Sequence, residues 1–475
     1  MKRLLLACLL VVVTAGMWSP RTQAAAPDPA FVADEIVVQF RDGTGEAQHR
    51  AARGLVQAVP KKRVRAQGNG AASIEVVGLP AQSNVQAALA VLRSDPNIAV
   101  AEPNWIYTHP VTTAIPNDRG YTNGSLWGMY GDDKPSPVGP AGTTNTYGSQ
   151  AEKAWNAGKT GSKAVYVGVI DEGIKYTHVD LDTNIWTNPG EIPDNGIDDD
   201  NDGYIDDVHG FDFYHNDGSV YDAGEDDHGT HVAGTIGAKS DATTWDGECA
   251  CGGVVGVNWN VTLISGKFLG PNGGNLADAI RAVDYFTMLK TQRGLNIVAL
   301  NNSWGGGGYS QLLLDAIVRA AQANILFIAA AGNDAGNNDA RPSYPSGYST
   351  AKGAGYDSVI AVAAIDQYGA LPSWSNRGAK TVDLGAPGVG IWSTTATPNQ
   401  YATDPYSQYS GTSMATPHVT GAVALYAAVY PNATAPQIRA ALLSTTIQTA
   451  ALASKTVTNG RLNIDGALKK VPGAR

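Results

Sequence analysis

The sequence predicts an α/β fold with a mostly parallel β-sheet and helices on both of its faces, preceded by a small α+β unit of the ferredoxin-like type. In the long C-terminal part, continuous apolar strands alternate with helical segments. This order is typical of a parallel sheet that is covered on both faces. In the N-terminal part, shorter strands with alternating polarity accompany helical segments, which predicts a separate small layer structure.

The first 24 residues carry the pattern of an export signal. Met1-Lys2-Arg3 precedes an apolar run from Leu4 to Val13, and Thr22-Gln23-Ala24 ends in a small residue. This pattern predicts a secretory signal over residues 1–24, because the apolar run is shorter than the about 20 residues that a membrane span needs. We therefore expect a secreted, extracellular protein with no membrane partner.

The composition limits the classes of partner. The chain of 475 residues has a formal net charge of −10, which argues against binding to nucleic acid. When Cys8 leaves with the signal, Cys249 and Cys251 remain. They are too close in sequence for an easy disulfide, and no further ligands suggest a thiolate metal site. We expect a monomer whose fold does not depend on disulfides.

Residues 25–110 form the predicted N-terminal unit. Strands are expected at Glu35–Phe40, Ser73–Val77 and Ile98–Val100, and a helix is expected at Val85–Leu92. The unit ends in the extended, aromatic-bearing segment Glu102–Tyr107, which is suited to lie in a peptide-binding groove as an added strand. An independent small domain followed by a linker is the alternative.

Residues 111–475 form the larger predicted domain, which begins with a loop-rich stretch up to Gly148. Buried strands are expected at Ala164–Ile170, Val261–Ile264, Asn296–Leu300, Ile325–Ala331 and Val359–Ala363. Helices are expected at Asn275–Thr291, Gln311–Ala323 and Val419–Tyr430.

Four polar residues stand at the ends of these elements. Asp171 and Asn333 follow predicted strands, whereas His228 and Ser413 stand where helices rich in small residues begin. In open α/β sheets, sites form at the carboxyl ends of the strands, and a helix N-terminus offers N–H groups to a developing oxyanion. Each residue alone has a structural explanation, such as a capping serine. Together they predict nucleophilic catalysis.

Five motifs surround these residues: Asp171-Glu172-Gly173-Ile174, His228–Gly234, Asn302–Gly305, Ala330–Asn333 and Gly411–Val419. In these motifs, this part of the chain resembles the subtilisin-like serine peptidases, the subtilases. The motifs occur in the order Asp, His, Ser that the family uses, and the serine motif is not the Gly-x-Ser-x-Gly elbow of the α/β-hydrolases. The resemblance implies a subtilisin-like fold and a secreted serine endopeptidase. Residues 25–110 likewise resemble the inhibitory propeptide of such enzymes, which implies a self-processing precursor with an intramolecular inhibitor.

The resemblance also implies roles for single residues. Ser413 would be the nucleophile, His228 the general base and acid, and Asp171 the group that holds the histidine tautomer. Asn333 and the backbone N–H of Ser413 would form the oxyanion hole. The polypeptide substrate would bind along Ser303, Trp304 and Gly305, next to an apolar pocket bordered by Ala331 and Gly332. No acidic pocket lining can be assigned, so strict specificity for basic residues is not expected.

Two positions depart from the common family pattern. Glu172 stands where Thr or Ser is commoner, so it adds a charge next to the catalytic aspartate. The run Gly305–Gly308 is unusually rich in glycine, which predicts a mobile substrate-binding edge. Neither departure removes a catalytic group. His231, one helical turn after His228, is expected to be structural.

The acidic loop, Asn195–Asp207, carries a calcium pattern. Its predicted ligands are Asp198, Asp200, Asp202, the Tyr204 carbonyl and Asp206, at positions 1, 3, 5, 7 and 9 of an EF-hand-type loop. Position 12 is His209 instead of Glu, so the remaining carboxylate would come from elsewhere, with Asp207 as the candidate. We expect this Ca²⁺ to be structural. A solvated acidic loop is the alternative.

Two other functions fit the same fold. The first is a non-catalytic, calcium-binding secreted protein, which the presence of all four catalytic positions disfavours. The second is an esterase or amidase that uses the same machinery. Cleavage of folded or denatured protein separates the second from an endopeptidase.

Overall fold

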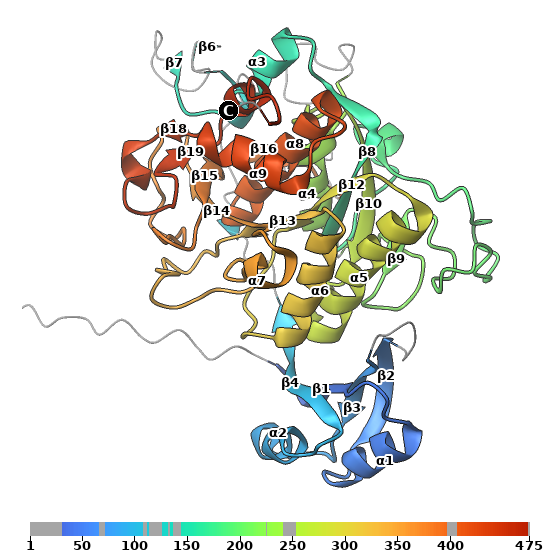
Figure 1. Cartoon of the computed structure of the whole chain (residues 1–475). Helices are drawn as coiled ribbons and strands as arrows, with labels where there is room; N and C mark the ends of the chain where they lie inside the picture. The colour runs from blue at the N-terminus through green and yellow to red at the C-terminus, as the bar shows by residue number, and fades with distance from the viewer. Residues whose placement is uncertain are drawn as a thin grey trace, which may run out of the picture.

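The structure is a computed structural model that describes residues 31–65, 72–107, 112–113, 126–131, 134–135, 144–224, 226–240, 253–396 and 406–473. The predicted signal at residues 1–24 and the pair Cys249 and Cys251 lie outside the described residues. Figure 1 shows a small N-terminal unit, drawn in blue, below a larger domain. In the part of the chain that the structure describes, no helix is both long enough and apolar enough to cross a bilayer.

The N-terminal unit is an antiparallel sheet with two helices. Its elements are β1 (Phe31–Phe40), α1 (Glu46–Gly54), β2 (Val59–Arg65), β3 (Ile74–Gly78), α2 (Val85–Arg93) and β4 (Ile98–Tyr107). The strand order is β4-β1-β3-β2. Ile36, Val38 and Phe40 on β1 pack with Leu89 and Leu92 on α2 in one core cluster, because alternate residues of a strand face the same side. The predicted α+β unit is confirmed.

The larger domain is built on a nine-stranded sheet in the order β18-β19-β15-β14-β13-β12-β8-β10-β9. Its strands are β8 (Gly161–Asp171), β9 (Gly210–Asp212), β10 (Asn260–Lys267), β12 (Ile297–Asn302), β13 (Leu326–Ala330), β14 (Val359–Ile365), β15 (Leu384–Pro387), β18 (Ile447–Gln448) and β19 (Gly460–Arg461). All neighbouring pairs are parallel except β18 with β19. The predicted mostly parallel sheet is confirmed.

Helices cover both faces of this sheet (Figure 1). One face carries α4 (Asp227–Gly237) and α8 (Thr412–Val429), and the other carries α5 (Leu276–Arg293) and α6 (Gln311–Gln322). Strand β8 contributes side chains to the core on both faces of the sheet. Val167 and Val169 pack in the cluster with α4 and α8, whereas Ile170 packs in the cluster with α5 and α6. Such a strand is buried on both sides, which explains its continuous apolar sequence.

The remaining α-helices and short strands lie around this framework. They are α3 (Ala151–Asn156), α7 (Ala351–Ala354), α9 (Ala435–Ser444), α10 (Ile464–Leu468), β5 (Thr112–Thr113), β6 (Lys134–Pro135), β7 (Thr144–Asn145), β11 (Gly274–Asn275), β16 (Ile391–Thr394) and β17 (Tyr406–Ser410). Strands β16, β17 and β5 form an antiparallel sheet.

The helices that face the N-terminal unit begin with side-chain caps. The Asn275 side chain accepts a hydrogen bond from the backbone N–H of Asp278 at the start of α5, and Ser310 does the same for Leu313 in α6. Such caps satisfy N–H groups that the helix itself cannot bond. Helices α5 and α6 therefore both begin at fixed positions next to β4.

Candidate active site

The predicted catalytic residues stand at the ends of elements along the carboxyl edge of the parallel strands. Asp171 is the last residue of β8, and Asn333 follows β13 by a short turn. His228 and Ser413 each lie in the first turn of a helix, α4 and α8. Asp171, His228 and Ser413 are 1%, 2% and 0% exposed. This edge is where an open α/β sheet places its site.

Asp171 and His228 form a direct hydrogen bond. The Nδ1 atom of His228 lies 2.8 Å from Oδ1 of Asp171. Because an ionised carboxylate only accepts hydrogen bonds, Nδ1 is the protonated nitrogen of the neutral ring. The other ring nitrogen, Nε2, is then the one that can accept a proton. The pair thus presents a base of defined tautomer.

Ser413 is tied to the end of β12 by two reciprocal contacts. Its hydroxyl donates to the backbone oxygen of Ser303 at 3.1 Å, and the Ser303 hydroxyl donates to the backbone oxygen of Ser413 at 2.8 Å. The Asn301 amide donates in turn to the Ser303 hydroxyl at 2.9 Å. These contacts hold the start of α8 against the sheet.

The Asn333 side chain has a fixed orientation. Its Oδ1 atom accepts hydrogen bonds from the backbone N–H of Thr412 at 3.0 Å and from the Thr412 hydroxyl at 2.9 Å. The opposite end of the amide, Nδ2, is therefore the donor end of the side chain. A donor next to the N-terminus of α8 is the arrangement that stabilises a developing oxyanion.

Two further histidines near this edge are fully buried. His231 contacts the backbone oxygen of Ile391 at 2.9 Å and stacks on Tyr409 at a ring distance of 4.4 Å. Burial lowers the pKa of His231 to about 3 and the pKa of His418 to about 4. Both rings are therefore neutral at ordinary pH, and their contacts are with the core.

The predicted substrate-binding side chains lie in the core. Ser303 and Trp304 are both 0% exposed, and the Trp304 ring packs on Phe268. The methyl group of Ala331 packs with Ala363 and Val382. Any contact of these three residues with a substrate would therefore come from their backbone atoms. Gly332 has φ +109°, and an added Cβ would meet Asn376 Nδ2 at 2.4 Å.

Strand β11 is an edge that the sequence did not reveal. It pairs antiparallel with β4, with Tyr107 opposite Gly274 and Ile106 opposite Asn275. The predicted tail of the N-terminal unit is therefore an added strand on the larger domain. A two-residue strand in a glycine-containing turn carries no periodicity, which explains why the pattern of apolar residues missed it.

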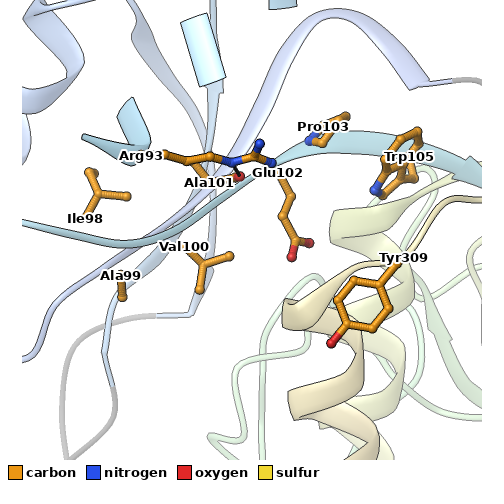
Figure 2. Close-up of a pocket in the computed structure, with 9 residues that line it drawn as sticks. All are labelled: Arg93, Ile98, Ala99, Val100, Ala101, Glu102, Pro103, Trp105 and Tyr309. Carbon is orange, nitrogen blue, oxygen red and sulfur yellow. Dashed lines mark hydrogen bonds between the residues drawn. The ribbon is translucent and has the colours of Figure 1, made fainter. Parts of the chain in front are cut away.

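Two more contacts seat this tail. An added Cβ at Gly308 would meet the Trp105 ring at 2.7 Å, so the predicted glycine-rich run is the place where this indole packs. The Glu102 carboxylate accepts hydrogen bonds from the Ser310 hydroxyl and the backbone N–H of Gln311. Figure 2 shows this carboxylate pointing from β4 toward the helix that follows Tyr309, beside a cavity of about 380 Å³.

The acidic loop brings several carboxylates together, with one unexpected member. Glu191, which precedes the loop, groups with Asp198 and Asp200, and Asp200 also groups with Asp202 and Asp207. The Asp202 side chain is 1% exposed, and its Oδ2 atom has no hydrogen-bond partner among the described residues, although Arg293 Nη2 lies 3.9 Å away. Burial, followed by the charge of Asp200, raises the pKa of Asp202 to about 6. These oxygens fit a hard cation such as Ca²⁺.

Three other predicted positions of this loop make contacts with the surrounding protein. Asp206 lies outside the carboxylate groups, because its side chain accepts hydrogen bonds from the backbone N–H groups of Asn195 and Gly196. The Tyr204 ring packs among Phe211, Phe213 and Tyr285. His209, at position 12, contacts the backbone oxygen of Trp186. The prediction of Asp206 as a ligand stays a prediction, although the contacts of its side chain in this structure are with backbone N–H groups.

Comparison with known proteins identifies relatives for both the larger domain and the N-terminal unit. Residues 162–467 match the Subtilase family, and residues 19–104 match the Fervidolysin N-terminal prodomain. A thermophilic serine proteinase from Bacillus sp. (strain AK1) is 32% identical over 420 residues, which cover 87% of this chain and 83% of that protein. An extracellular protease from Xanthomonas campestris is 32% identical over 446 residues, covering 87% of this chain and 68% of that protein.

A solved structure shares the fold. The crystal structure of fervidolysin from Fervidobacterium pennivorans, described as a keratinolytic enzyme related to subtilisin, superposes with a TM-score of 0.65 at 23% sequence identity. The match covers 94% of this chain and 62% of the fervidolysin chain. The present chain thus spans less than two thirds of the length of that protein.

Proposed function

The chain belongs to the subtilase family of serine peptidases, and from this premise we propose that it is an endopeptidase with a catalytic triad of Ser413, His228 and Asp171. The observation that carries the proposal is the 2.8 Å contact between His228 Nδ1 and Asp171 Oδ1 at the end of β8. This contact gives the His228 ring a defined tautomer, so that it can act as a base. The ring lies at the edge of the sheet where α8 also begins.

In the first half of the reaction, the Ser413 hydroxyl attacks the carbonyl carbon of the scissile peptide bond. His228 Nε2 takes the hydroxyl proton, and Asp171 stabilises the imidazolium that results. The oxyanion accepts hydrogen bonds from Asn333 Nδ2 and from the backbone N–H of Ser413. Collapse of this intermediate breaks the C–N bond, His228 returns the proton to the leaving amine, and an acyl-enzyme forms.

In the second half, water attacks the acyl-enzyme. His228 takes one proton from the water, and the same donors stabilise the second tetrahedral intermediate. When the bond to Ser413 breaks, His228 protonates the serine oxygen. The products are the free acid and the regenerated hydroxyl.

The substrate is an extended polypeptide that adds a strand to the enzyme. We assign β11 as one edge of its binding groove, because β4 already pairs with Gly274 and Asn275 in an antiparallel manner. Ser303, Trp304 and Gly305 would form the other edge through their backbone atoms. Ala331 and Gly332 remain the predicted border of the pocket, again through the backbone.

The N-terminal unit is a prodomain, and we propose that it inhibits the enzyme by occupying this groove. Residues 25–110 would remain bound after the enzyme cuts its own chain between Tyr107 and Asn117. The pairing of Tyr107 with Gly274 supports this role, because a substrate strand would compete for the same edge. Export by the predicted signal at residues 1–24 would deliver the enzyme to the extracellular space.

A structural Ca²⁺ in the acidic region completes the proposal. Glu191, Asp198, Asp200, Asp202 and Asp207 would hold it, because their oxygens already converge. The buried Oδ2 atom of Asp202, which lacks a hydrogen bond among the described residues, is the kind of acceptor that a cation satisfies. The ion would neutralise the crowded carboxylates and stabilise this insertion, with no part in the chemistry.

The test compares wild type with Ser413→Ala and with a matched control, Ser349→Ala, which changes an exposed serine bonded to Asp357. We expect wild type and the control to hydrolyse a chromogenic peptide and denatured protein, and we expect a serine-directed sulfonyl fluoride to block both. Ser413→Ala should be inactive and should accumulate as the unprocessed precursor. A Ser413→Ala variant with normal turnover would refute the triad, and hydrolysis of small esters without any protein cleavage would support the esterase alternative.

A further inference from the structure

The Glu172 carboxylate is bonded to the backbone of the histidine segment. Glu172 follows Asp171 directly in the sequence, and it is only 4% exposed. Its Oε1 atom accepts a hydrogen bond from the backbone N–H of His228, in the first turn of α4. The backbone N–H of Glu172 meanwhile donates to Asp171 Oδ1 at 2.9 Å. Glu172 thus contacts both partners of the Asp171–His228 pair.

Glu172 fills a position that the helix leaves open. The N-cap residue of α4, Asp226, makes no side-chain cap hydrogen bond to its own helix. Its carboxylate instead accepts hydrogen bonds from the Lys267 ammonium and from the backbone N–H of Asp222. A helix N-terminus needs an acceptor for its first N–H groups and favours a negative charge. Glu172 supplies both from the end of β8.

Lys267 holds the backbone of Glu172 in place. It lies opposite Asp171 in the register of β10 with β8, and it is 0% exposed. Its Nζ atom donates to the Glu172 backbone oxygen at 2.7 Å and lies 3.3 Å from Asp222 Oδ2. Burial alone would lower the pKa of Lys267, but the hydrogen bond and charge of Asp226, with Asp212 and Asp222, raise it above its ordinary value. The ammonium therefore stays charged and joins the end of β8 to the start of α4.

Glycine allows the two segments to approach this closely. Gly173 has φ +127°, and an added Cβ would meet the backbone oxygen of Val220 at 2.7 Å. An added Cβ at Gly229 would meet the backbone oxygen of Gly173 at 2.2 Å. The backbone after Glu172 and the backbone after His228 are therefore in direct contact.

We propose that Glu172 is a positioning residue, whose carboxylate holds the first turn of α4 so that the His228 ring keeps its contact with Asp171, while Lys267 fixes the Glu172 backbone. This inference rests on the proposed role of His228 as the general base. The alternative is that the Glu172 carboxylate binds a basic side chain of the substrate. The low exposure of Glu172 and its bond to a backbone N–H favour the positioning role.

The charges around His228 determine how the proposal can be tested. The titratable groups around it are Asp171 and Glu172 at the end of β8, Asp222 before α4, Asp226, Asp227 and His231 at α4, Lys267 on β10, Tyr409 on β17 and His418 on α8. His231 and His418 are neutral because burial lowers the pKa of both. Lys267 is balanced by Asp226. Loss of the Glu172 carboxylate therefore removes a negative charge close to the His228 imidazolium.

The experiment measures kcat, KM and the pH profile of kcat/KM for Glu172→Ala and Glu172→Gln. The concentration of active sites is determined by titration with a sulfonyl fluoride, and kcat is calculated from it. Because small misplacements of a catalytic group have large effects, we expect kcat of Glu172→Ala to fall by about 10- to 100-fold with KM nearly unchanged. Glu172→Gln keeps an acceptor for the His228 N–H and should recover most of kcat. In both variants the acid limb of the profile should move to lower pH by about one unit, because an opposite charge near the imidazolium is lost.

Other results would overturn the inference. An unchanged kcat with a raised KM, confined to substrates with a basic residue beside the cleaved bond, would show that Glu172 faces the substrate. Equal losses in Glu172→Ala and Glu172→Gln with an unshifted acid limb would also refute positioning. If Glu172→Ala does not fold, Glu172→Asp replaces it: the charge remains but the carboxylate is withdrawn, so kcat should fall while the acid limb stays in place, and a normal kcat would refute the proposal.

The controls separate this inference from the proposed function. Asp465→Asn removes a carboxylate of α10 that pairs with Lys469, and it should leave kcat and the pH profile unchanged. An inactive wild type would refute the proposed peptidase. An active wild type with a fully active Glu172→Ala variant would refute only the positioning role.

Discussion

The Glu102 carboxylate of the prodomain accepts a hydrogen bond from the backbone N–H of Gln311 in the first turn of α6. Ser310, the N-cap residue of that helix, donates its hydroxyl to the same carboxylate. Burial raises the pKa of Glu102 to about 7, although these hydrogen bonds oppose the shift. The prodomain therefore places a titratable group at the contact that seats it on the enzyme.

This relationship predicts that inhibition depends on pH. The pKa of Glu102 is about 7 in the complex and 4.5 in a solvated carboxyl group, so the complex binds more protons than the separated parts between these values. By linkage, the affinity increases as pH falls from about 7 and levels off below about 4.5. Prodomain residues 25–110 added in trans should inhibit the mature enzyme at least about tenfold more tightly at pH 5 than at pH 8.

The matched control for this pH effect is Glu102→Gln. It keeps an acceptor for Ser310 and Gln311 but cannot titrate, so its inhibition constant should show little of the wild-type difference between pH 5 and pH 8. An unchanged pH dependence in this variant would assign the effect to other groups.

The close contact of the Trp105 ring with Gly308 predicts a second effect on inhibition. An added Cβ at Gly308 would meet the Trp105 ring at 2.7 Å, so Gly308→Ala should weaken inhibition by the prodomain in trans by about tenfold, within the usual effect of overpacking. The prodomain variant Trp105→Ala should bind the Gly308→Ala enzyme no worse than it binds wild type. Additive losses in the double variant would mean that the two residues do not interact.

Asn333→Ala tests the oxyanion donor. We expect kcat to fall by about 10² to 10³ with little change in KM, which is the effect of removing the oxyanion-hole asparagine of subtilisin. Asn337→Ala changes an exposed asparagine nearby and should retain full activity. A fall in stability with unchanged kcat would instead indicate that Asn333 only anchors Thr412.

Removal of Ca²⁺ should lower the melting temperature of the enzyme. Asp202→Asn should abolish this dependence on chelator, because the buried Oδ2 atom is a proposed ligand. Asp206→Asn should retain it, because the Asp206 side chain bonds Asn195 and Gly196. An unchanged melting temperature after complete chelation would refute the calcium site, and equal effects of the two variants would identify Asp206 as a further ligand.

The residues at the ends of long elements could be predicted from the sequence. Asp171 and Ser413 stand where a buried strand and a buried helix are plain from apolar patterns, and a parallel sheet brings such ends to one edge. The pairing of β11 with the prodomain tail could not be predicted, because two residues have no period. Local spacing was also insufficient in the acidic region. It did not show that Glu191 groups with Asp198 and Asp200 or that the Asp206 side chain bonds backbone N–H groups, because side-chain direction in a loop depends on which backbone N–H groups each carboxylate meets.

The pairing of β5 with β17 has a kinetic consequence. Thr112 lies opposite Ser410 in this short ladder, whereas Tyr107 lies opposite Gly274 in the ladder of β4 with β11. Tyr107 and Thr112 are thus both tethered to the enzyme, and Ser413 lies a few residues after Ser410 in the sequence. Such tethering replaces a bimolecular encounter with an intramolecular one. The first cut should therefore be first-order in precursor, with a half-time that does not change on dilution.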